Sequence, residues 1–190
     1  MKNTLFKAIS LTLITLLMLF SFTGCFAALL AEKNEVEDNL NSMNDALGDL
    51  DFDDEEGLSS VLDNADNALN SAEDYFNKLP DSTKPRDMEE YLSNSSVKSQ
   101  LDSQLSSMQT SEYSVTVEAD GNELIYLFKY KVMLDASAAK PALEKGMSSV
   151  DSYYTSMVGT MQAVVTTPGV KITIKYLNAD GTLIYSKTYR

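Results

Sequence analysis

The hydrophobic pattern of this chain changes its period near residue 110, and this change limits the fold more than any other feature. Before it, apolar residues recur every three or four positions, as they do on one face of an α-helix. After it, apolar and polar residues alternate, as they do in a half-buried β-strand. The sequence therefore predicts an α+β protein, with a helical region at 32–109 and an α+β domain at 110–190.

The helical region is acidic. Residues 32–110 hold 20 acidic and 5 basic side chains, whereas 111–190 holds eight of each. Two amphipathic stripes joined by a short acidic segment cannot bury their apolar faces alone, so we expect an antiparallel helical hairpin. A further helix is predicted over 87–108, with a weak point at 93–96, where Ser and Asn have low helix propensity. The two stripes comprise Val36, Leu40, Met43, Leu47 and Leu50, then Leu58, Leu62, Ala65, Leu69, Ala72, Phe76 and Leu79.

The second region is predicted to form two β-hairpins separated by a helix. Asp120-Gly121 and Asp180-Gly181 supply the turns, because glycine tolerates the positive φ of tight hairpins. One long helix is expected to start near Ser137 and to end at Pro168-Gly169. The order ββαββ predicts a four-stranded antiparallel sheet packed on one long helix. The expected strands are 113–118, 123–134, 170–176 and 182–189.

The N-terminus has the layout of a secretory signal peptide. Lys2 and Lys7 precede an uncharged apolar stretch over 8–22. The segment Phe22-Thr23-Gly24-Cys25 that follows resembles the lipobox of bacterial lipoproteins. That resemblance implies cleavage between Gly24 and Cys25 and attachment of a diacylglyceryl group to Cys25.

We therefore expect a signal peptide at 1–24, an apolar anchor-proximal linker at 25–31, and a chain held by lipid at the extracytoplasmic face of the cell membrane. Two alternatives remain open for this segment. The apolar residues 8–31 are long enough to form an uncleaved membrane anchor. Cys25 could instead be a buried free thiol.

Composition excludes several kinds of chemistry. The chain has no His and one Cys, so a Ser-His-Asp or Cys-His nucleophile, a His-ligated metal and an intramolecular disulfide are ruled out. A net charge of −13 argues against nucleic acid as a partner. An EF-hand loop starting at Asp49 fails, because Asp54 and Ser60 stand where Gly and Glu are required. We expect no cofactor and no metal site.

A group of four lysines is the candidate ligand or docking patch. The predicted strands place them on the sheet face opposite the apolar one, where an anionic ligand or the acidic helices could bind. The alternative is an ordinary solvated face of an antiparallel sheet. Ile125, Leu127 and Met133 share this face and favour a covering partner. The four lysines are Lys129, Lys131, Lys171 and Lys175.

Residues 90–190 resemble an uncharacterised family, a domain of unknown function found in small Gram-positive surface lipoproteins. The resemblance rests on Tyr126–Lys131, Val170–Tyr176 and Asn178-Ala179-Asp180-Gly181-Thr182. That family carries no established activity and no catalytic residues. It implies a small extracytoplasmic α+β domain behind a lipid anchor.

Three functions are compatible with these features. The leading hypothesis is a non-catalytic binding or protein-interaction module that meets a protein partner at the cell surface. A second is an enzyme that acts on wall polymers through carboxylates such as Glu89 and Glu90. A third is a structural protein that self-associates through the stripes at 36–50 and 58–79.

Overall fold

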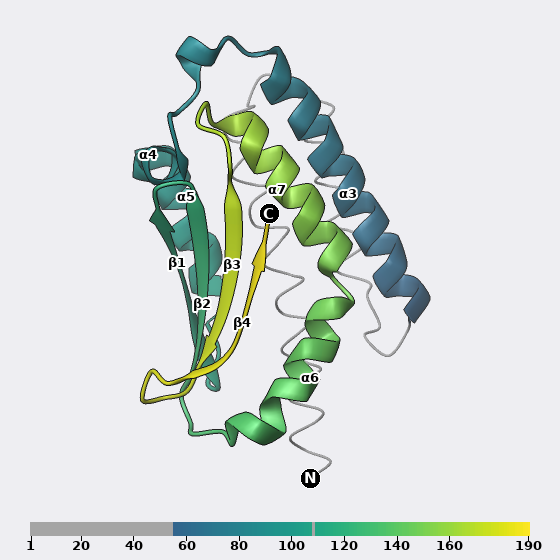
Figure 1. Cartoon of the computed structure of the whole chain (residues 1–190), viewed down its shortest axis with the longest axis vertical. Coiled ribbons are helices and arrows are strands. Elements are labelled where there is room, and N and C mark those ends of the chain that lie inside the picture. The colour runs from purple at the N-terminus through teal and green to yellow at the C-terminus, as the bar shows by residue number, and fades with distance from the viewer. Residues whose placement is uncertain (1–54, 108) are drawn as a thin grey trace.

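A computed structural model of the protein describes residues 55–107 and 109–190. Within them, a four-stranded sheet carries a layer of helices on one face, and a further helix lies outside that layer (Figure 1). The mixed α+β architecture predicted from the sequence is confirmed at this level. The elements are α3 (Glu55–Lys78), the 3-10 turn η1 (Asp81–Thr83), α4 (Met88–Ser93), α5 (Ser95–Ser107), β1 (Tyr113–Asp120), β2 (Glu123–Tyr130), α6 (Ala136–Ser148), α7 (Asp151–Val164), β3 (Lys171–Leu177) and β4 (Leu183–Tyr189).

The sheet is mixed, and the prediction of a purely antiparallel sheet was wrong. Its strand order is β1-β2-β3-β4. The two hairpins are antiparallel, but β2 and β3 are parallel neighbours. The reason is the connection between them. Because α6 and α7 carry the chain back along the sheet, β3 starts at the same end as β2, which is how parallel strands are joined.

The single long helix expected after Ser137 is two helices. α6 ends at Ser148 and α7 begins at Asp151, and Val150 between them leaves helical geometry with φ −118° and ψ 12°. Serine and β-branched valine are poor helix formers, so this is a weak point in the sequence. Beyond the break, the Asp151 carboxylate accepts hydrogen bonds from Lys187 and Tyr189 of β4. These contacts fix the start of α7 against the sheet.

The helices of the acidic region match the predicted positions where they are described. α3 occupies the second stripe, and the third helix is interrupted at the expected weak point, giving α4 and α5. The Asn94 side chain accepts hydrogen bonds from the backbone N–H groups of Ser96 and Val97 and so starts α5. Asp87 caps α4 in the same way, through the N–H of Glu90. The first stripe at 36–50, and with it the hairpin, lies outside the described residues.

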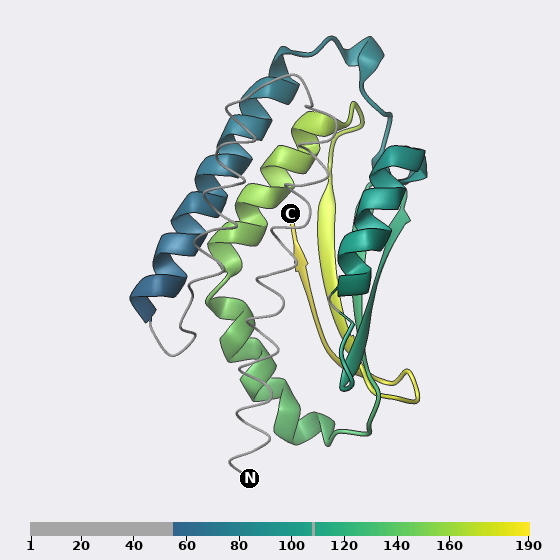
Figure 2. The same cartoon turned by 180° about the vertical axis from the view of Figure 1, so that it is seen from behind.

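One face of the sheet carries the hydrophobic core, and it is rich in tyrosine. Phe128 of β2 stacks on Tyr176 of β3, with ring centroids 4.8 Å apart. Tyr154 of α7 stacks on Tyr189 of β4 at the same distance. Tyr126 and Tyr153 are also fully buried in this cluster. Residues of α4, α5, α6 and α7 belong to the same core, so the described helices that touch the sheet all lie on one side of it (Figure 2).

α3 is the outermost helix and packs against α7 (Figures 1 and 2). Leu69, Ala72 and Phe76 of α3 are buried. Gly159 and Thr160 of α7 lie at this contact, and small side chains there allow two helices to approach closely. The described part of the second apolar stripe is therefore buried within the same chain.

Candidate functional site

The second face of the sheet carries none of the described helices, and this open sheet face contains the predicted lysine patch (Figure 1). Its centre is formed by β2 and β3. Ile125, Leu127 and Leu177 lie there and are half-exposed. Leu183, paired with Leu177 across the β3–β4 hairpin, is 57 % exposed. The surface is therefore apolar in the middle, which is unusual for the solvated side of a sheet.

The structure brings two of the four lysines together. Lys175 lies opposite Leu127 in the β2–β3 register, and Lys129 lies opposite Leu177, so the two lysines are diagonal neighbours at one end of the open face. Lys171 lies at the other end of the same strands, opposite Glu123. Lys131 follows the last residue of β2, and its ammonium group donates a hydrogen bond to the backbone carbonyl of Thr110. The predicted patch is thus one close pair and two separate lysines.

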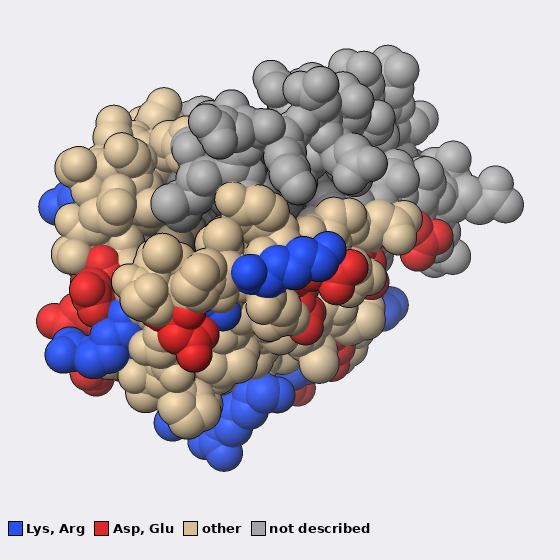
Figure 3. All heavy atoms as spheres, turned by 90° about the horizontal axis from the view of Figure 1, so that it is seen from above, with Lys and Arg blue, Asp and Glu red and all other residues tan. Residues whose placement is uncertain are grey.

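Acidic groups are interspersed with these lysines. Glu123 accepts a hydrogen bond from the Thr173 hydroxyl, and Thr173 in turn is hydrogen-bonded to Thr188. Hydrogen bonds from Thr182 hold the pKa of Asp180 below its usual range, and the charge of Lys129 contributes to the lowering. Figure 3 shows basic and acidic side chains mixed in the same way on the described surface seen from above. Charge alone would not give this face strong affinity for a polyanion.

The described acidic helices do not cover these lysines. α4 and α5 pack on the opposite face of the sheet, and α3 packs on α7. The interaction between the lysine patch and the helices at 32–110, one of the two roles considered for the patch, does not occur in the described part of that region.

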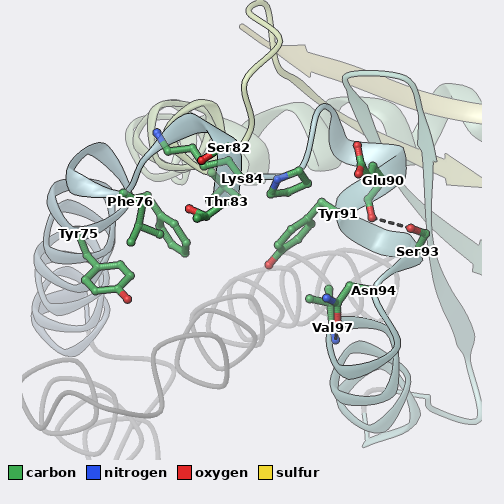
Figure 4. A pocket seen from close by; sticks show the side chains of 13 residues that line it. Tyr75, Phe76, Ser82, Thr83, Lys84, Glu90, Tyr91, Ser93, Asn94 and Val97 are labelled. Atoms are coloured by element: carbon green, nitrogen blue, oxygen red, sulfur yellow. Dashed lines mark hydrogen bonds between the residues drawn. The ribbon is translucent and has the colours of Figure 1, made fainter.

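A cavity of about 450 Å³ lies between the end of α3, the connection that follows it, and the α4–α5 corner (Figure 4). Its volume is in the range of small-molecule sites. Aromatic side chains of Tyr75, Phe76 and Tyr91 line it, together with the polar side chains of Glu90 and Asn94. The sequence did not predict this cavity, because it forms only where the end of α3, the α4–α5 corner and Val164 of α7 pack together.

The polar groups at this cavity already serve the fold. Glu90 accepts a hydrogen bond from the backbone N–H of Arg86 at 2.8 Å. Asn94 supports the first turn of α5. Lys84, whose side chain is 9 % exposed, lies 3.4 Å from the carboxylate of Asp81. These contacts hold the corner in place, and they leave the aromatic rings as the main recognition surface of the cavity.

Other predicted features lie outside the described residues or have no counterpart among them. Gly24 and Cys25, the predicted cleavage and lipidation residues, are in the part of the chain that the structure does not describe. Within the described ranges, no three acidic or sulfur ligands gather where a metal could bind. No helix in those ranges is long and apolar enough to cross a membrane.

Comparison with known proteins places the sheet and its helices in a family. No curated protein and no solved structure matches the chain significantly. Residues 88–189, from the start of α4 to the end of β4, match the family described as "Domain of unknown function (DUF4854)". The match covers more than half of the 190 residues, and the protein therefore belongs to the DUF4854 family.

Proposed function

We propose that the protein is a lipoprotein anchored through Cys25 at the extracytoplasmic face of a Gram-positive membrane, where it acts as a non-catalytic interaction module for a protein partner. The anchor is supported by the lipobox-like segment that ends in Cys25. Two acyl chains give durable attachment, because each buried methylene contributes about 0.8 kcal/mol. The chain beyond Cys25 would then face the exterior.

The open sheet face is the observation that carries the interaction role. The side of a sheet that faces solvent ordinarily presents polar residues. Here the two central strands present Ile125, Leu127 and Leu177, with Lys129 and Lys175 beside them. Such a surface suits a protein partner that offers apolar side chains to the centre and a carboxylate to the lysine pair.

The cavity at the α4–α5 corner supports a second, minor role in binding. Tyr91 and Asn94 lie within residues 88–189, whereas Tyr75 and Phe76 precede them. A ligand there would be recognised jointly by the DUF4854 domain and by α3. Glu90 is the carboxylate that lines this cavity among the described residues, and two-carboxylate hydrolysis would need a partner for it. The enzyme hypothesis has no specific observation in its favour.

Photo-crosslinking on intact cells tests the interaction role. A photoreactive amino acid replaces Ile125 in the full chain, and the membranes are irradiated and probed for adducts. We expect one defined adduct with another protein. It should be lost with Leu127→Glu and with Lys175→Glu, which change the apolar centre and the lysine pair. Thr155→Glu is the matched control, because Thr155 is exposed on α7, on the helix side of the sheet and away from the open sheet face.

The control variant should leave the adduct unchanged. Thermal melting of each purified variant establishes that it folds. The proposal is contradicted if Leu127→Glu and Lys175→Glu leave the adducts unchanged, or if Thr155→Glu reduces them as much.

A further inference from the structure

The two edges of the sheet differ in how their backbone groups are used. β1 forms one edge and β4 the other. On β1, the carbonyl of Tyr113 accepts a hydrogen bond from the N–H of Thr110, and the carbonyl of Val115 accepts one from the Gln109 side chain. The segment at 109–110 therefore covers part of that edge. No comparable contact to the outer side of β4 exists among the described residues.

The strand registers identify which residues of β4 point outward. The backbone N–H and C=O groups of a strand alternate in direction from one residue to the next. Since the carbonyls of Tyr113 and Val115 point away from β2, the strand registers fix the direction of these groups at the remaining paired residues of the sheet. The N–H of Lys171 donates to the carbonyl of Asn122, which agrees with odd-numbered residues of β3 facing β2. The even-numbered residues of β3 therefore face β4.

In the β3–β4 register, Ile172 lies opposite Tyr189 and Ile174 lies opposite Lys187. The backbone groups of Tyr185, Lys187 and Tyr189 are thus used in pairing with β3. Ser186 and Thr188, which alternate with them, direct their N–H and C=O groups away from the sheet. Both residues are exposed. The outer edge of β4 therefore offers two donors and two acceptors to another strand.

The one charged residue within β4 does not protect this edge. Edge strands of soluble proteins often carry a lysine that discourages pairing with other chains. Lys187 instead lies on the helix side of the sheet, where its ammonium group binds the carboxylate of Asp151 and lies 5.3 Å from the centre of the Tyr189 ring. Its charge is neutralised within the chain.

We propose that β4 pairs antiparallel with β4 of a second copy of this chain. With the two-fold axis at Lys187, Ser186 of one copy lies opposite Thr188 of the other. The outward N–H of each of these residues then meets the outward C=O of the residue opposite. The same register places Tyr185 opposite Tyr189 of the second copy, and aromatic cross-strand pairs stabilise sheets. Each Lys187 keeps its own Asp151. A second copy of β4 therefore brings both the matching backbone groups and the matching tyrosines. A strand of an unrelated partner would have to provide both.

A photo-crosslinking experiment on the purified full chain in detergent tests the pairing. With a photoreactive residue at Ser186, we expect an adduct of twice the chain mass. The same residue at Thr116, on β1, is the matched control and should give none. Adding Thr188→Pro should abolish the adduct, because proline removes an outward N–H while Lys187 and Tyr189 keep their bonds to β3. Thr188→Glu keeps that N–H and adds charge at the edge, so it should also abolish the adduct.

Thermal melting identifies any variant that has lost its fold. If Thr188→Pro does not fold, the result with Thr188→Glu decides whether the adduct depends on the β4 edge. The pairing is overturned if the adduct forms equally from Thr116, if neither Thr188 variant reduces it, or if Ser186 crosslinks to a different protein instead of a second copy.

Discussion

The hydroxyl of Thr160 donates a hydrogen bond to the backbone carbonyl of Leu69, with the two oxygens 3.2 Å apart across the contact between α7 and α3. Thr160 is fully buried, and its hydroxyl also reaches the carbonyl of Ser156 in its own helix. Because α3 precedes the residues that match the family, this bond links the DUF4854 domain to the segment before it.

Replacing this hydroxyl should weaken the attachment of α3. Thr160→Val keeps the shape of the side chain and removes the donor, so we expect a loss of about 1 kcal/mol in the free energy of unfolding. Chemical denaturation measures it. Thr155→Val is the matched control, since Thr155 is exposed on the same helix and bonds only to Asp151 of its own turn in the described contacts. A control as costly as Thr160→Val would contradict this account of the contact.

Substitutions at Gly159 test how closely α3 and α7 pack. A Cβ at this position would lie 3.3 Å from a carboxylate oxygen of Glu73, at the end of a flexible side chain that can move. Gly159→Ala should therefore raise the free energy of unfolding by about 0.5–1 kcal/mol, the helix-propensity gain. Gly159→Leu should lower it by about 1–3 kcal/mol, because the larger side chain overpacks the contact. Equal effects of the two substitutions on denaturation would show that the helices do not touch there.

Asn178 joins the loop after β2 to the turn after β3. Its side chain is 4 % exposed, accepts a hydrogen bond from the N–H of Leu134 at 2.8 Å and donates to the carbonyl of the same residue. Asn178→Ala leaves both backbone groups of Leu134 without this partner, so we expect a loss of about 2 kcal/mol in stability. Asn70→Ala, at an exposed position of α3, should change the denaturation midpoint little.

The lowered pKa of the Asp87 carboxyl leads us to expect a specific dependence of stability on pH. The backbone N–H of Glu90, and next the guanidinium of Arg86, hold the pKa of Asp87 below its usual range. A carboxylate with a lowered folded-state pKa stabilises the fold above its unfolded pKa, and that contribution disappears as pH falls through the folded value. The melting temperature of Asp87→Asn should therefore be below that of the wild type at pH 7, and the difference should narrow below pH ~3. A difference independent of pH would contradict this role.

Periodicity predicted the elements but not their directions. Alternation located β1 and β3 to within a few residues, and the weak segment at 93–96 was confirmed as the boundary between α4 and α5. The parallel pairing of β2 and β3 was not predicted, because alternating residues have the same pattern in either direction. The break at Val150 was also missed, since this residue fits the apolar stripe and is buried, and only its backbone leaves the helix.

The candidate site was predicted only in part. Alternation placed Lys129, Lys171 and Lys175 on the face opposite the core, as the registers confirm. The closeness of Lys129 to Lys175 depends on the register between strands that 40 residues separate, which no local pattern encodes. Lys131 follows the strand end, so its bond to Thr110 was outside the reach of a strand pattern. The cavity at the α4–α5 corner depends on tertiary packing in the same way.

The mass of the mature chain recovered from the membrane fraction tests the central claim most directly. The account predicts a polypeptide that begins at Cys25 and carries a diacylglyceryl group on that residue. A full-length chain with an unmodified Cys25 thiol, recovered from the soluble interior of the cell, would contradict it.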